Sequence, residues 1–178
     1  MPSGDPLVLE LGPADGPALR LEWDVEALRE LDAAPGHRGA DGALSTWRLD
    51  RKPDWGERAS ALRVISASFE DGSLLGVAAL RPRGAAGHDA DAVGAVLVSA
   101  EGEVARLHEA LLSTEYGPDG RARRLGLELY EDSTRPPLRV VADRVADARQ
   151  GAGREQTKFR LKMEGISGAG LHELMPPG

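Results

Sequence analysis

The sequence predicts an all-β protein in which an antiparallel meander of about nine to ten strands closes into a barrel or a strongly bent sandwich. Three observations support this fold class. Short apolar or alternating runs follow one another along the chain, turn-forming residues separate them, and no helical period extends far enough to form a stable helix. Because an open sheet of this size would expose its edge strands, closure is the economical arrangement.

The first two predicted strands flank a loop rich in glycine and proline. Residues 6–11 and 18–25 are apolar runs on either side of residues 12–17, whose Gly and Pro residues continue neither strand. Residues 26–32 carry leucines three apart, which is enough for a single helical turn. The later apolar or alternating runs, from which the remaining strands are drawn, are 43–49, 62–69, 74–80, 93–99, 103–108, 111–116, 123–131, 138–145, 157–163 and 171–174.

The clearest hairpin joins strands 62–69 and 74–80. Asp71-Gly72 stands between these two apolar runs, and this dipeptide favours a type I′ or bulged turn because glycine adopts positive φ without steric cost. The polar, Gly-rich residues 81–91 that follow have no apolar period of their own. They are predicted to be a mobile connection at one end of the sheet.

The composition predicts one folded, acidic domain. Of 178 residues, 41% are hydrophobic, so the chain can bury a core, and we interpret residues 1–178 as a single β-barrel-like domain. The formal net charge of -7 argues against nucleic acid and anionic membranes as partners. Without cysteine, the chain has no disulfide and no thiolate nucleophile. No apolar run is as long as a membrane helix, and the N-terminus lacks a signal-peptide pattern, which predicts a cytoplasmic protein.

Three short motifs occur in a fixed order along the chain. They are Trp55-Gly56, then Ser66-Ala67-Ser68-Phe69-Glu70-Asp71-Gly72, and finally Gly168-Ala169-Gly170-Leu171-His172-Glu173. In this order they resemble the C-terminal half of the lipocalin-like AttH family, which includes carotenoid 1,2-hydratase-like proteins. The family pattern is a Trp-Gly loop, a strand ending in Ser-Ala-Ser-Phe-Asp-Asp-Gly, and a closing Gly-x-Gly-x-x-Glu. The resemblance covers about residues 18–175.

The resemblance implies a lipocalin-like, calycin-like barrel. Members of the family typically have two consecutive barrels, and the better-known relatives hydrate, cyclise or isomerise apolar polyenes and similar metabolites. This chain has the length of one barrel, so a homodimer or a partner barrel is the implied assembly.

The candidate catalytic residues are Asp54 and Glu57, which flank Trp55. Where the family tends to show Asp-His-Ser-Trp-Gly, this chain has Lys-Pro-Asp-Trp-Gly at 52–56, so the histidine and serine are missing. Polyene hydration or cyclisation needs a carboxylic acid kept protonated by an apolar site. A carboxylate beside a tryptophan could supply it. The alternative is that the Trp-Gly pair only closes one end of the barrel.

The candidate ligand-binding residues are Trp23, Trp47 and Trp55, the large aromatic platforms of a chain in which aromatic residues make up only 4%. The four histidines show no metal-binding spacing, so the sequence predicts no metal site, and no motif indicates a cofactor. His88, in a Gly-rich loop, is predicted to be solvated. Neighbouring His172 and Glu173 would face opposite sides of a strand and therefore form no dyad.

These inferences lead to two hypotheses of different classes. The first is a one-barrel, lipocalin-like protein that binds an apolar metabolite such as a polyene, terpenoid or polyketide, with hydration, cyclisation or isomerisation as candidate reactions. The second is a non-enzymatic module, either a lipid carrier or a structural or regulatory partner of another barrel. A ligand-sized cavity would favour the first, and a packed interior with an apolar patch outside would favour the second. The sequence does not decide whether the chain is an enzyme.

Overall fold

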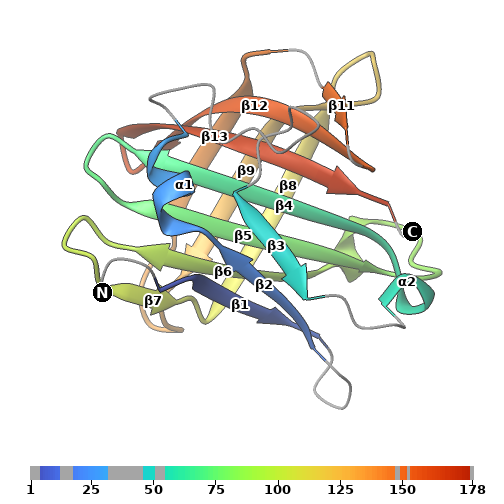
Figure 1. Ribbon diagram of the computed structural model, residues 1–178, viewed down its shortest axis with the longest axis horizontal. Coiled ribbons are helices and arrows are strands. Elements are labelled where there is room, and N and C mark those ends of the chain that lie inside the picture. Colours follow the sequence, from blue (N-terminus) through green and yellow to red (C-terminus); the bar gives the residue numbers. More distant parts are fainter. Residues whose placement is uncertain are drawn as a thin grey trace.

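The computed structural model describes residues 5–12, 18–31, 46–50, 55–146, 149–151 and 153–176. Within these residues the strands form two antiparallel sheets (Figure 1). The small sheet has the order β1-β2-β3, with β1 (Leu7–Leu11), β2 (Leu19–Trp23) and β3 (Trp47–Asp50).

The large sheet has the order β7-β6-β5-β4-β13-β12-β10-β9-β8, with β11 beside β12. Its strands are β4 (Ala59–Phe69), β5 (Leu74–Pro82), β6 (Ala92–Val98), β7 (Val104–Arg106), β8 (Glu109–Tyr116), β9 (Ala122–Tyr130), β10 (Leu138–Arg144), β11 (Arg149–Gly151), β12 (Arg154–Met163) and β13 (Ile166–Met175).

The large sheet curls so far that its two edge strands, β7 and β8, follow one another in the chain. β7 pairs with β6, β8 pairs with β9, and Leu107 and His108 alone separate β7 from β8. The N–H of Leu107 donates to the carbonyl of Ala95 (3.2 Å), and the N–H of His108 donates to the carbonyl of Tyr130 (2.8 Å), so the two residues continue opposite ladders. Figure 1 shows β8 and β9 crossing behind β4 and β5. The predicted all-β fold, an antiparallel meander that curls towards a barrel, is therefore confirmed.

β4 is buried on both faces. Ile65 and Ala67 belong to the inner core, which fills the space inside the curl, whereas Leu62 and Val64 belong to the outer core beneath the small sheet. The small sheet lies across the outer face of β4, β5 and β6 (Figure 1). This double coverage explains why the neighbours Val64 and Ile65, which face opposite sides of the sheet, are both apolar.

The small sheet is joined to the large one through a motif serine. Ser66 Oγ accepts hydrogen bonds from Trp23 Nε1 (2.9 Å) and from Thr46 Oγ1 (2.9 Å). Gly76 faces Ser66 across the β4–β5 ladder, and a Cβ at this glycine would lie 2.9 Å from Trp23 Cε2. Glycine is therefore required here because the indole packs directly on the β5 backbone.

The structure differs from the prediction most clearly at its C-terminal strand. β13 starts well before the predicted strand 171–174, so Gly168 and Gly170 lie inside it and not in a turn. A Cβ at either glycine would lie 2.6 Å from a carbonyl oxygen of β4, that of Ser68 or of Ser66. The glycines thus mark close approach of a neighbouring strand. The short strand β11 was not among the predicted strands.

The turn and helix predictions are largely confirmed. Gly72 has φ +89°, and its N–H donates to the carbonyl of Phe69 (2.9 Å), as in a bulged Asp-Gly hairpin. The single helical turn is α1 (Val25–Arg29), and the Asp24 carboxylate caps it by accepting from the N–H groups of Glu26 and Ala27. The other described helices are α2 (Trp55–Arg58) and the 3₁₀ turn η1 (His88–Ala90). None of these helices has the length and apolar character to cross a bilayer.

Candidate functional site

A cavity of about 190 Å³ opens at one end of the curl, between β4, β5 and β13 on one side and the β8–β9 hairpin on the other. We call it the mouth cavity. Small apolar residues, Ala61, Ala79 and Ala122, form part of its wall. Its polar lining residues are Arg63, Arg81, His88, Thr114, Tyr116, Arg121, Glu155 and His172. Deeper inside the curl, the side chains of the inner core fill the space.

Two arginines that line this cavity share one buried carboxylate. Asp91 accepts from Arg63 Nη2 (2.7 Å) and from Arg81 Nε (2.9 Å), and its side chain is only 1% exposed. Burial would raise the pKa of Asp91, but the hydrogen bonds from Arg81 and Arg63 hold it below the ordinary value. Arg63 Nη1 also donates to Thr114 Oγ1 (2.7 Å) and so links β4 to β8 across the cavity.

His88 connects this ion cluster to Tyr116. Arg81 Nη2 forms a hydrogen bond with His88 Nδ1, and because a guanidinium can only donate, Nδ1 is the acceptor. Burial, followed by the charges of Arg63 and Arg81, lowers the pKa of His88, so the ring is neutral at pH 7 and carries its proton on Nε2. Nε2 then donates to Tyr116 Oη (2.7 Å), which leaves the phenol proton directed to another acceptor.

His172 is the buried titratable group of the cavity. Its side chain is 5% exposed, and its Nε2 has no hydrogen-bond partner among the described residues. Burial, followed by the charge of Arg63, lowers the pKa of His172 to about 4, so the imidazole is neutral at physiological pH. A buried polar nitrogen without a partner costs about 1–3 kcal/mol, which a ligand atom in the cavity could recover.

The next residue along β13 faces the opposite way, as the sequence predicted. Glu173 lies under the small sheet and accepts from Gln156 Nε2 (2.7 Å), from Arg154 Nη1 (3.3 Å) and from Trp47 Nε1. The Arg154 guanidinium also lies 4.7 Å from the centroid of the Trp47 ring. Burial raises the pKa of Glu173, and the bonds from Gln156 and Trp47 oppose it. The Gly-x-Gly-x-x-Glu motif therefore ends in a residue that anchors β3 to the large sheet.

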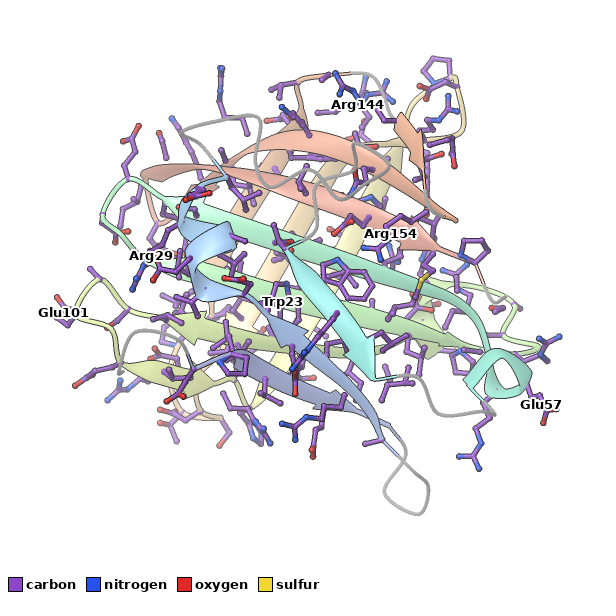
Figure 2. All side chains as sticks on the ribbon, in the orientation of Figure 1. Trp23, Arg29, Glu57, Glu101, Arg144 and Arg154 are labelled. Atoms are coloured by element: carbon purple, nitrogen blue, oxygen red, sulfur yellow. The ribbon has the colours of Figure 1, made fainter. Side chains whose placement is uncertain are left out.

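The predicted catalytic residues are not at the mouth cavity as far as the structure describes them. Asp54 lies outside the described residues. Glu57 is exposed on α2, and Figure 2 shows it pointing away from both sheets. Trp55 is placed by its backbone at the start of α2, and its side chain is outside the described part. A catalytic role for Asp54 and Glu57 stays a prediction.

The other predicted ligand-binding residues, Trp23 and Trp47, lie between the two sheets. Both side chains are buried in the outer core, on the opposite face of the large sheet from the mouth cavity. They also border a second hollow, of about 530 Å³, beside α1. Ligand binding by Trp23, Trp47 and Trp55 stays a prediction, and the observed contacts of the first two are structural.

The sequence analysis did not predict the mouth cavity, although one residue indicated a buried polar contact there. Arg63 is the one charged residue of the predicted strand 62–69, and such a residue must find a partner when the strand is buried. The partner, Asp91, lies in the segment predicted to be a mobile connection. His88 in the same segment is 36% exposed at its side chain and also contacts Arg81 and Tyr116.

Comparison with known proteins supports the fold. The sequence matches no protein-family model and no curated protein. Two solved structures are similar. One is a protein assigned as AttH from Nitrosomonas europaea, with 15% identity, a TM-score of 0.55, and coverage of 96% of this chain and 56% of that one. The chain shares its fold with AttH-like proteins. The other is kievitone hydratase from Nectria haematococca, with 11% identity, a TM-score of 0.51, and coverage of 95% and 64%.

The structural likeness confirms the AttH-like resemblance inferred from the motifs at the level of the fold. The chain spans 56% and 64% of the lengths of the two similar chains.

Proposed function

We propose that the chain binds a small, largely apolar metabolite with its polar end in the mouth cavity, and that His172 and Tyr116 move a proton to or from it. The observation that carries this proposal is the unpartnered, buried His172 in the same cavity as Tyr116. The likeness to a hydratase supports it as a fold-level analogy.

Hydration and double-bond isomerisation both suit such a pair of groups. Hydration places a proton on one carbon and a hydroxyl group on its neighbour, and a single water supplies both. Isomerisation removes a proton from one carbon and returns it to another. A neutral imidazole can accept a proton while a phenol donates one, so no net proton is consumed. The alanines of the wall leave room for the apolar part of the ligand.

Filling the mouth cavity should abolish ligand binding. Ala61 is a half-buried wall residue, so Ala61→Phe would place a ring in the cavity, whereas Ala61→Ser at the same position keeps the space open. Native mass spectrometry of the protein from its own source should show a retained metabolite in the unmodified chain and in the serine variant, but not in the phenylalanine variant. Equal retention in both variants would place the ligand elsewhere and refute the proposal.

A second candidate function is pairing with another barrel. Leu111 of β8 and Val141 of β10 are 48% and 38% exposed, and both line a hollow of about 990 Å³ bounded by β8, β9, β10 and the 3₁₀ turn η1. If this face is an interface, Leu111→Glu should reduce self-association or partner binding at least about tenfold, because the interface would bury an unpaired charge. The matched control is Val104→Glu, which places the same charge at another exposed apolar position. Native mass spectra that show only monomers would exclude self-pairing.

A further inference from the structure

We infer that the metabolite taken by the mouth cavity carries a single carboxylate group, bound among Arg63, Arg81 and Arg121. This inference rests on the proposed function and adds the chemical class of the ligand. Two features of the cavity support it, its charge balance and the hydrogen-bonding character of its wall.

The charged groups of the cavity leave one positive charge unbalanced. Arg63 and Arg81 share the single carboxylate of Asp91. Arg121 has its own partner, since Arg121 Nε lies 3.2 Å from Glu155 Oε2. Three guanidinium groups therefore face two carboxylates. Charges are weakly screened at the buried Arg63–Asp91 pair and more strongly screened at Arg121, whose side chain is 42% exposed. One anionic ligand group beside the buried pair would complete the balance.

The histidines of the cavity do not change this balance near pH 7. Burial and the neighbouring arginines lower the pKa of both His88 and His172, so both rings stay neutral. The site thus lacks the additional positive charge that a dianionic phosphate would favour. A monoanion such as a carboxylate matches it better.

The hydrogen-bonding groups of the wall are mostly donors. The Thr114 hydroxyl accepts from Arg63, and the Tyr116 hydroxyl accepts from His88, so both have a proton left to donate. The guanidinium groups of Arg63, Arg81 and Arg121 have no acceptor atom at all. The acceptors Asp91 and Glu155 are already engaged by arginines. A carboxylate, which only accepts, complements the arginine, threonine and tyrosine donors of this wall.

The test compares hexanoate with its neutral isostere hexanamide. Isothermal titration calorimetry would measure both affinities at constant ionic strength, and the side-chain nitrogen resonances of His172 would report whether the probe enters the cavity. We expect hexanoate to bind about tenfold more tightly than hexanamide, the difference expected of charge-assisted hydrogen bonds. Inorganic phosphate, titrated alone, shows whether any small anion suffices.

Arginine variants identify the source of the preference. Arg81→Gln leaves a balanced Arg63–Asp91 pair, and Arg121→Gln leaves Glu155 bonded to Gln150 Nε2 (2.9 Å), so each variant should bring the ratio of the two affinities close to one. The matched control is Arg123→Gln, which removes an exposed arginine of β9 that does not line the cavity. Thermal unfolding would confirm that each variant is folded.

The possible outcomes separate this inference from the proposed function. If hexanamide shifts the His172 resonances and binds as tightly as hexanoate, the carboxylate inference is overturned while the binding cavity stands. Equal affinity for phosphate and hexanoate, or an unchanged preference in both arginine variants, also overturns it. If neither six-carbon probe shifts the His172 resonances, the proposed cavity fails and the inference fails with it.

Discussion

Asp91→Ala should lower the free energy of unfolding by about 4 kcal/mol, because it removes the shared carboxylate from two arginines. Arg63 is only 6% exposed and would keep a buried positive charge with no anion to balance it. Arg81, which is more exposed, can turn to water and would contribute less. Asp91→Asn retains one acceptor oxygen and should lose about half as much. Urea unfolding at neutral pH measures both values.

The control for this prediction is Asp89→Ala, an exposed carboxylate in the same 3₁₀ turn, which should change the stability by less than about 0.5 kcal/mol. A second test separates charge from packing. The double variant Arg63→Met with Asp91→Ala removes the buried charge together with its partner, so it should be more stable than Asp91→Ala alone. Equal losses for Asp89→Ala and Asp91→Ala would show that the ion cluster does not stabilise the fold.

Local chemistry explains why most strands could be predicted. The Asp71-Gly72 turn needs a positive φ that glycine alone adopts freely, and its flanking apolar runs have no alternative to pairing. Such signals depend on neighbours in the sequence. The role of Gly168 and Gly170 could not be predicted in this way, because it depends on the backbone of β4, which lies far away in the chain. A glycine in a turn and a glycine beneath a neighbouring strand look the same in a sequence.

The mouth cavity depends on contacts of the same long-range kind. The pairing of Arg63 with Asp91, and of His88 with Tyr116, follows from how the sheet curls, and no spacing rule gives it. The three family motifs predicted the fold, but they did not predict the position or the lining of the mouth cavity. Ser66 and Glu173, the motif residues with the best-defined contacts, join the small sheet to the large one. They are therefore a signature of how the two sheets pack, and His172 is the motif residue that reaches the cavity.

Acidification from about pH 7 to pH 4 should destabilise the folded chain by about 3 kcal/mol through His172 alone. The folded-state pKa of about 4 lies below the ordinary value of 6.5. As the pH falls through this interval, the unfolded chain takes up the proton first. The stability from neutral, buried His172 is therefore nearly complete above about pH 6.5, decreases between these two pKa values, and levels off once the pH is below the folded-state value of about 4.

The variant His172→Gln isolates this contribution from that of the carboxylates, which titrate in both proteins. Free energies of unfolding measured at intervals from about pH 7 to 4 should fall less steeply for the variant, and the difference between the two curves should reach about 3 kcal/mol. His108→Gln, which removes an exposed histidine, is the matched control and should follow the unmodified chain. Parallel curves for His172→Gln and the unmodified chain would mean that His172 is hydrated in the folded state and is not the desolvated, unpartnered imidazole that the proposed function requires.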